Sequence, residues 1–305
     1  MARIGVISDE FWAVVEPLMP AYGGRRGRPW NDHREMLEAI CWRYRTGSPW
    51  RDLPTELGRW QTVWARHFRW STDGTYDRIL VAAKRAGFVQ DVEGDAVIEL
   101  LSVDSTVVRA HQHAAGAARA SPRRSFRRSS RTQGAPSNDK NLPVEPADHA
   151  LGRSRGGLST KIHSLTDQRA CPVTVILTPG QAGDNPQLVP LLDLHRRQQR
   201  GVRARRFRVL ADRAYSHPST RKELRRRRIG YTIPQRSDQQ AHRQAKGSRG
   251  GRPPGFEAEE YKRRNAVERG YARLKQWRGI ATRYDKHALT FLGGVHLAAS
   301  VLHLR

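Results

Sequence analysis

The sequence predicts an α/β protein in which a small helical N-terminal domain precedes a larger α/β core. Two observations lead to this prediction. Seven of the eight tryptophans lie within the first 70 residues, which marks a separate N-terminal module. Further along, apolar strand-like runs alternate with helical patterns, and two of these runs end in an aspartate. We expect the helical domain to cover residues 1–90 and the core to cover residues 95–305.

Three short helices are expected in the N-terminal domain. The first shows the i, i+3, i+4, i+7 spacing of an amphipathic helix in its apolar residues, which are Leu37, Ile40, Cys41 and Tyr44. The sequence Thr46-Gly47-Ser48-Pro49 ends this helix. Similar patterns run over residues 60–68 and 75–86. This arrangement favours a helix-turn-helix-like bundle, and the alternative is a helical core with no role in DNA binding.

The chain is strongly basic, with 55 Lys and Arg against 29 Asp and Glu and a formal net charge of +26. Such a charge predicts a polyanionic partner. Double-stranded DNA fits best, because arginine pairs with phosphate through two hydrogen bonds. A membrane surface fits less well, because no basic amphipathic helix with a clean apolar face is evident. Arg25, Arg26 and Arg28 lie in a Gly-rich stretch that we expect to bind DNA as a flexible arm.

The α/β core begins with β character over residues 95–112, and an apolar strand-like run within it ends at Asp104. A basic low-complexity insertion over residues 114–157 separates it from a hairpin with strands at 159–165 and 172–177. The elements that follow are a helix at 184–200, a strand at 206–212 ending in Asp212, a helix at 218–228, a strand at 230–233, a polar basic loop at 235–254, a helix bearing Glu268 and an apolar helix at 287–304. This order describes a ribonuclease-H-like layer, in which carboxylates gather at one end of the sheet.

The helix bearing Glu268 carries four polar residues on one face. Tyr261, Arg264, Glu268 and Lys275 are spaced 3, 4 and 7 residues apart. At 100° per residue they share a stripe roughly 60° wide. A helix face that aligns one carboxylate with two cations and a phenol suits an anionic partner that is bound together with a metal ion. We expect Tyr261, Arg264 and Lys275 to contact DNA, because basic side chains make most phosphate contacts.

Asp104, Asp212 and Glu268 form a carboxylate triad suited to phosphoryl chemistry. Two Mg²⁺ ions ~3.5–4 Å apart can activate a water or a 3′-hydroxyl and stabilise the leaving oxygen. Because Mg²⁺ prefers oxygen ligands, three carboxylates can hold two ions if Asp104 bridges them, and Mn²⁺ is an expected substitute.

Other candidate ligands have less support in the sequence. His111 and His113 could bind zinc or iron, but no further His or Cys has a recognisable spacing. Asp184 lies near the expected sheet end and is not assigned as a ligand. Only two cysteines, far apart, are present, and no apolar stretch reaches ~18 residues. We expect a cytoplasmic, nucleoid-associated protein that does not bind membranes.

These residues resemble those of the DDE transposases of bacterial insertion sequences, in the branch with a Tyr-Arg-Glu-Lys signature (insertion sequence family five). Besides the signature helix, the similarity includes residues 45–54, 103–106, 157–163, 180–184 and 210–215. The resemblance implies a ribonuclease-H-like core in which Asp104, Asp212 and Glu268 are catalytic. It also implies Mg²⁺-dependent nicking at terminal inverted repeats, joining of the freed 3′ ends to target DNA, and a homodimer or larger synaptic complex.

Two other functions remain open. One is a catalytically idle regulator that occupies the inverted repeats. The other is a metal-dependent nuclease that cleaves DNA without joining it, because water and a DNA 3′-hydroxyl compete for the same metal site.

Overall fold

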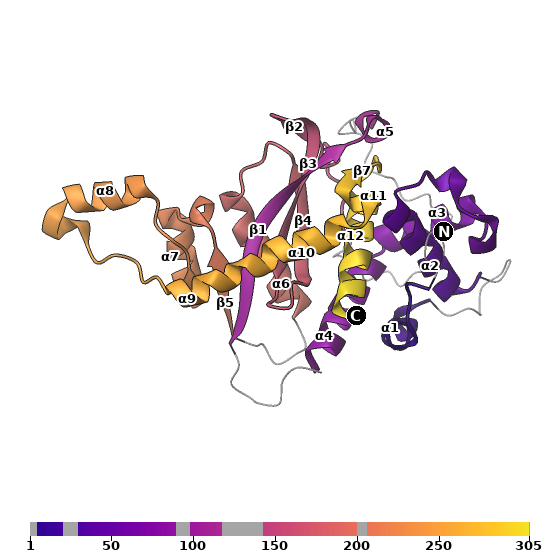
Figure 1. Cartoon of the computed structure of the whole chain (residues 1–305), viewed down its shortest axis with the longest axis horizontal. Coiled ribbons are helices and arrows are strands. Elements are labelled where there is room, and N and C mark those ends of the chain that lie inside the picture. The colour runs from indigo at the N-terminus through magenta and orange to yellow at the C-terminus, as the bar shows by residue number, and fades with distance from the viewer. Residues whose placement is uncertain (1–4, 21–29, 90–97, 118–142, 200–205, 305) are drawn as a thin grey trace.

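The computed structural model describes residues 5–20, 30–89, 98–117, 143–199 and 206–304. It has a helical N-terminal part followed by a mixed sheet with helices on both faces, which confirms the predicted α/β class (Figure 1). The predicted basic arm with Arg25, Arg26 and Arg28 lies outside the described residues. No helix in these ranges is long and apolar enough to span a bilayer.

The N-terminal part contains the three predicted helices and one more. They are α1 (Asp9–Val15), α2 (His33–Thr46), α3 (Trp60–Thr72) and α4 (Thr75–Val89). The Asp32 side chain caps α2 by accepting a hydrogen bond from the Glu35 amide. The helix ends as predicted at Gly47, which adopts a left-handed φ of 72°.

Helix α12 (Ala288–His303), near the end of the chain, packs against these N-terminal helices. Two glycines make this close approach possible. A Cβ atom at Gly294 would lie 2.1 Å from the Tyr44 ring, and one at Gly293 would lie 2.8 Å from the Tyr76 ring. One apolar core therefore includes residues of α2, α3, α4 and α12 together with one face of the sheet.

Within the described ranges, the sheet has seven strands: β1 (Glu99–Ala110), β2 (Gly152–Ser154), β3 (Gly157–Thr166), β4 (Pro172–Pro179), β5 (Phe207–Ala211), β6 (Gly230–Thr232) and β7 (Thr282–Arg283). β3 pairs antiparallel with both β1 and β4, which confirms the predicted hairpin. β5 is parallel to β1 on one side and to β6 on the other. The antiparallel meander therefore continues into a parallel half through β1.

Helices cover both faces of the sheet. One face packs on α6 (Leu188–Gln198) and α7 (Pro218–Arg226), as the core residues Leu101, Val209 and Leu191 illustrate. The other face is crossed by α10 (Ala266–Lys275), as Figure 1 shows. Alternation along β1 assigns Leu101 and Val103 to the α6 face, and therefore Asp104 to the α10 face.

Four details differ from the sequence-based expectations. Asp104 does not end its strand, because β1 continues to Ala110. The segment 235–254, expected to be a loop, contains α8 (Ser237–Ala245) and a 3₁₀ turn, η6 (Gly247–Gly250). Residues 112–115 form the short helix α5 (Gln112–Ala115) at the predicted start of the insertion. The signature helix consists of α9 (Ala258–Lys262), the 3₁₀ turn η7 (Arg263–Asn265) and α10, and α11 (Arg278–Ala281) follows.

Candidate active site

Asp104 and Asp212 lie at matching positions of neighbouring parallel strands. β1 and β5 pair in register up to Val103 and Ala211, and each aspartate is the next residue of its chain. The alternation of side chains therefore places both aspartates on the same face of the sheet. Asp212 directly follows β5, and its Oδ1 accepts a hydrogen bond from the Ala214 amide at 2.9 Å.

Glu268 reaches this face from α10, and Arg264 connects it to Asp104. Nη1 of Arg264 donates a hydrogen bond to Oδ2 of Asp104 at 3.0 Å, and Nη2 donates to Oε1 of Glu268 at 2.6 Å. The side chain of Glu268 is 55% exposed and that of Asp104 is 26% exposed. Two of the three predicted catalytic carboxylates are thus joined by one guanidinium and remain open to solvent.

The pKa of Asp104 is raised above its ordinary value. Burial is the largest cause, and the negative charge of Asp212 adds to the rise. Hydrogen bonds from the Ser105 amide and from Arg264 oppose it. The negative charge of Asp212 therefore acts on Asp104, as expected for two acids that follow paired positions of neighbouring strands.

The other two signature residues lie on the same face of the helix. The guanidinium of Arg264 is 6.0 Å from the centre of the Tyr261 ring. Nζ of Lys275 donates to the Val107 carbonyl of β1 at 3.2 Å, and burial lowers the pKa of this lysine. Arg264 and Lys275 thus both contact β1, although the 3₁₀ turn η7 interrupts the continuous α-helix on which the predicted stripe was based.

Two family models match the chain. Residues 7–80 match a family described as a putative transposase of the IS4/5 family, and residues 95–301 match the transposase DDE domain. The second match covers more than half of the sequence. The chain belongs to the DDE transposase family.

Similar proteins include two that are named for insertion elements. An uncharacterized protein, y4sN, of Sinorhizobium fredii is 40% identical over 116 residues, which cover 37% of this chain and 84% of the relative. An uncharacterized 16.2 kDa protein of insertion element IS402 from Burkholderia cepacia is 37% identical, over 34% of this chain and 74% of the relative. A putative transposase for insertion sequence element IS6501 from Brucella ovis is 31% identical, over 48% of this chain and 100% of the relative. No solved structure matches the chain significantly.

Tyr271 is a residue of this DDE-family site that our sequence reasoning missed. Its hydroxyl donates to the Asp104 carbonyl at 2.6 Å and accepts a hydrogen bond from Ser164 at 3.0 Å. Burial raises the pKa of this buried tyrosine. Tyr271 lies three residues after Glu268 and four before Lys275, so the same helical spacing could have identified it.

Asp184 lies on the opposite face of β1, beside Ser105. Its Oδ1 accepts hydrogen bonds from the Ser105 hydroxyl at 2.7 Å and from Nζ of Lys161 at 2.8 Å. Burial pushes the pKa of Asp184 up, but these hydrogen bonds outweigh it and the pKa is lowered. Asp184 therefore supports the strand next to Asp104 and is directed away from the face that Glu268 occupies.

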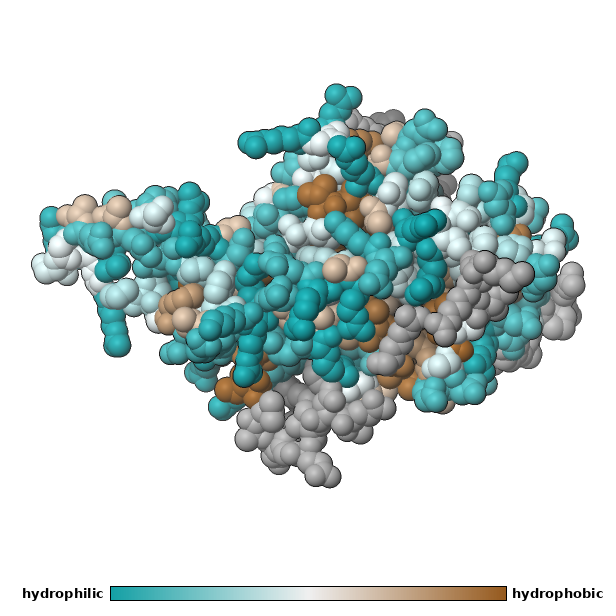
Figure 2. Space-filling model, viewed as in Figure 1, coloured by the Kyte–Doolittle hydropathy of each residue, from teal (hydrophilic) through white to brown (hydrophobic). Residues whose placement is uncertain are grey.

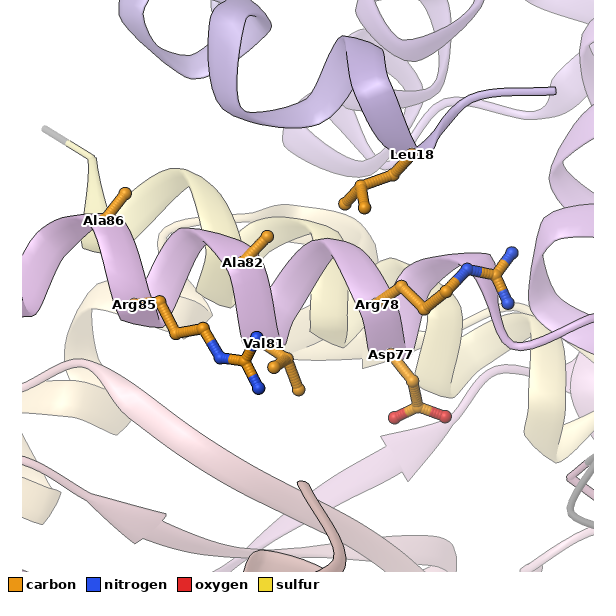
Figure 3. Close-up of a pocket in the computed structure, with 7 residues that line it drawn as sticks. All are labelled: Leu18, Asp77, Arg78, Val81, Ala82, Arg85 and Ala86. Atoms are coloured by element: carbon orange, nitrogen blue, oxygen red, sulfur yellow. The ribbon is translucent and has the colours of Figure 1, made fainter. Parts of the chain in front are cut away.

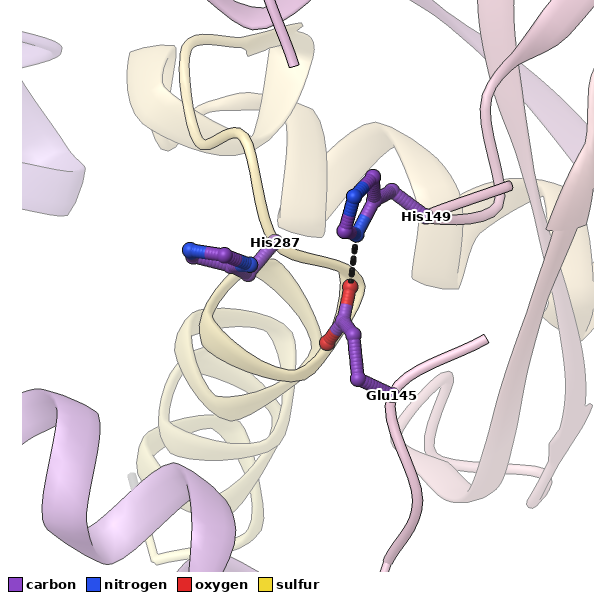
Figure 4. Close-up of side chains that lie close together, drawn as sticks. All are labelled: Glu145, His149 and His287. Carbon is purple, nitrogen blue, oxygen red and sulfur yellow. Dashed lines mark hydrogen bonds and ion pairs between the residues drawn. The ribbon is translucent and has the colours of Figure 1, made fainter. Parts of the chain in front are cut away.

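Within the described ranges, two other groups of side chains have the composition of a metal site. Glu145, His149 and His287 lie together at the start of α12 (Figure 4), where the carboxylate accepts hydrogen bonds from the Ala288 and Leu289 amides. Their arrangement is that of a helix cap.

The second group is Asp167, Cys171 and His303, and it is fully buried. The guanidinium groups of Arg169 and Arg273 lie beside it, at 3.4 Å from Asp167 and 3.5 Å from Cys171. Two adjacent positive charges disfavour a cation there. His111 and His113 belong to neither group. The triad itself is not among these close groups, and Arg264 stands between Asp104 and Glu268.

A depression on the surface of the N-terminal part lies between Leu18 and the outer face of α4 (Figure 3). It contains one carboxylate, Asp77, and two arginines, Arg78 and Arg85. This composition does not favour a metal ion.

The face of the molecule that carries α10 is mostly hydrophilic, and so is the projecting segment around α8 (Figure 2). A polar surface of this kind suits a charged macromolecule better than an apolar ligand.

Proposed function

We propose that this chain is an active DNA transposase that binds the terminal inverted repeats of its own element. In this proposal it cleaves phosphodiester bonds and transfers the 3′-OH ends to target DNA, with Asp104, Asp212 and Glu268 as catalytic residues. The observation that carries the proposal is the convergence of Asp104 and Glu268 on one guanidinium, with Asp212 at the adjacent strand position, in a member of the DDE family. We further propose that the sheet has a ribonuclease-H-like topology. We also propose that the chain belongs to the branch of the family with the Tyr-Arg-Glu-Lys signature.

The side chains present fit Mg²⁺ ions. All three candidate ligands offer carboxylate oxygens, the donor type that Mg²⁺ and Mn²⁺ prefer. The guanidinium between Asp104 and Glu268 indicates that this position already favours a positive charge. Asp104, Asp212 and Glu268 would hold two ions, which would supply an activated oxygen nucleophile and charge stabilisation at the leaving oxygen.

The remaining residues position the carboxylates and the DNA. Tyr271 fixes the backbone of Asp104 relative to α10. Tyr261, Arg264 and Lys275 form the face along which a DNA backbone would run, with arginine and lysine neutralising phosphates. We propose the same role for Arg25, Arg26 and Arg28, and a homodimer or larger complex that pairs the two element ends.

The test uses labelled duplexes that carry the inverted repeats flanking the gene, a supercoiled target and Mg²⁺. Asp104→Ala and Glu268→Gln should reduce nicking and joining by more than about 100-fold, because each removes a metal ligand. Both variants should still bind the labelled duplex. Glu259→Gln is the matched control, because Glu259 lies on α9 with its side chain 85% exposed and pairs with Lys262.

Each outcome separates the candidate functions. Joined products with wild-type protein, absent with both variants, support the transposase. Cleavage by wild-type protein without joined product identifies a nuclease. Binding by wild-type protein without any cleavage identifies a DNA-binding regulator and contradicts the proposed role of the carboxylates.

A further inference from the structure

Arg264 occupies a position between two carboxylates where a metal ion is proposed to bind. Its two terminal nitrogens bind different acids, Asp104 on the sheet and Glu268 one helical turn further along. The side chain of Arg264 is only 16% exposed, so the guanidinium is held inside the site and not on its rim. Burial disfavours its charge, but the hydrogen bond and charge of Asp104 outweigh this, and the pKa of Arg264 is raised.

We infer that Arg264 is a resident counter-cation that competes with divalent metal for Asp104 and Glu268. The inference rests on the proposed function, because it takes these carboxylates to be the metal ligands. In the absence of metal, the guanidinium offsets the repulsion among the clustered acids. A metal ion held between the two acids, at the place of the guanidinium, displaces it from Oδ2 of Asp104, from Oε1 of Glu268 or from both.

The structure gives Arg264 a place to move. The residue belongs to the 3₁₀ turn η7, between α9 and α10, and its guanidinium already lies 6.0 Å from the centre of the Tyr261 ring. A small rotation of the long side chain releases Glu268, which is the more exposed of the two acids. A DNA phosphate at this face then supplies a new bidentate partner for the released guanidinium.

This competition makes the metal affinity of the free protein lower than its carboxylates alone would provide. Removing the guanidinium should therefore tighten metal binding, although it removes a residue of the signature. A residue whose only role is to orient the carboxylates, or only to hold DNA, would have the opposite effect or none. The sign of the change in metal affinity distinguishes these roles.

The test measures binding of Mn²⁺ to the full chain without DNA, from the electron paramagnetic resonance signal of free Mn²⁺ at pH 8. The proteins compared are wild type, Arg264→Met, Arg264→Lys and Asp104→Asn. We expect Arg264→Met to lower the Kd for Mn²⁺ about tenfold, with a smaller decrease for Arg264→Lys, which keeps the charge but loses the fork that spans both acids. Arg269→Met is the control, because Arg269 is exposed and lies on α10 next to Glu268. Circular dichroism verifies that each variant is folded.

The outcomes separate this inference from the proposed function. If Arg264→Met binds Mn²⁺ as weakly as wild type or more weakly, Arg264 is not a competitor and the inference is overturned. If Asp104→Asn binds Mn²⁺ as well as wild type, the carboxylates are not the metal ligands and the proposed function itself fails.

Discussion

Asp104 is held at both its side chain and its backbone. Its carboxylate accepts hydrogen bonds from the Ser105 amide and from Arg264, and its carbonyl accepts one from Tyr271. Tyr271 and Glu268 belong to the same helix, so the last of these bonds fixes the distance between the two proposed ligands. A catalytic site depends on such positioning, because small displacements of a reacting group are costly.

Replacing Tyr271 by Phe removes this connection and keeps the ring. We expect the free energy of unfolding to fall by about 1–2 kcal/mol, since a buried carbonyl loses its donor. Strand transfer should fall by roughly three- to tenfold with duplex binding unchanged, because Asp104 loses its fixed position. The measurements are urea denaturation and the joining assay.

Tyr231→Phe is the matched control for this variant. The Tyr231 hydroxyl is exposed and accepts a long hydrogen bond, 3.4 Å, from Arg225. Equal losses in the two variants would mean that the Tyr271 hydrogen bond has no special role in the site.

The first turn of helix α12 is capped by a side chain that is distant in the sequence. Glu145 accepts hydrogen bonds from the Ala288 amide at 2.6 Å and the Leu289 amide at 2.9 Å, at the end of the helix where amides lack partners. Its negative charge also complements the positive end of the helix dipole. Residues 143 positions apart in the chain are thereby joined.

Glu145→Gln removes the charge and one of the two acceptor oxygens. We expect a loss of about 1 kcal/mol in the free energy of unfolding, typical for a helix cap. Glu257→Gln should leave stability unchanged in the same denaturation experiment, because Glu257 precedes α9 but makes no side-chain capping bond. A loss of stability in the control equal to that in Glu145→Gln would contradict the capping role.

The sequence predicted those elements whose pattern is local. The helical stripe of Glu268, the hairpin of β3 and β4 and the end of α2 at Gly47 all follow from spacing or turn residues within a short window. The helix α8 was missed because none of its residues is buried, so it has no apolar periodicity to detect. The position of Asp104 inside β1, and not at its end, was not predicted, because the residues that continue the strand pair with β3, a partner more than 40 residues away. The bridge formed by Arg264 depends on the register of β1 against α10, which no local pattern encodes.

At the scale of the whole molecule, a buried polar network connects the N-terminal helices to α12. His67 of α3 lies at its centre, with Nδ1 at 2.8 Å from the Tyr76 hydroxyl and Nε2 at 3.1 Å from the Thr290 carbonyl. Tyr44 donates to the same carbonyl at 3.0 Å. Burial lowers the pKa of His67 to about 4, so the imidazole is neutral in the folded protein.

This network predicts a loss of stability in mild acid. Above pH 6.5, His67 is neutral in both the folded and the unfolded chain, and its contribution to stability is complete. As the pH falls from 6.5 towards 4, only the unfolded chain takes up the proton, so the free energy of unfolding decreases. His67 alone should account for about 2 kcal/mol between pH 7 and pH 5.

Urea denaturation at several pH values measures this slope. His67→Gln, which keeps a donor and an acceptor but does not titrate, should show a shallower slope than wild type even if it is less stable at pH 7. An identical slope in both proteins would show that His67 does not titrate on unfolding. His163, with a pKa lowered by burial to about 4, acts in the same direction and remains in both proteins.

The shared core of α2, α3, α4 and α12 has a consequence for biosynthesis. Leu80 of α4 leaves the ribosome long before Leu302 of α12, although both belong to one apolar cluster. At typical rates of elongation the interval is roughly 10–40 s. During this time the N-terminal helices expose the apolar surface that α12 covers in the folded protein, and we expect the nascent chain to be prone to aggregation until α12 is made. A chain that lacks α12 would leave this apolar surface of α2, α3 and α4 uncovered.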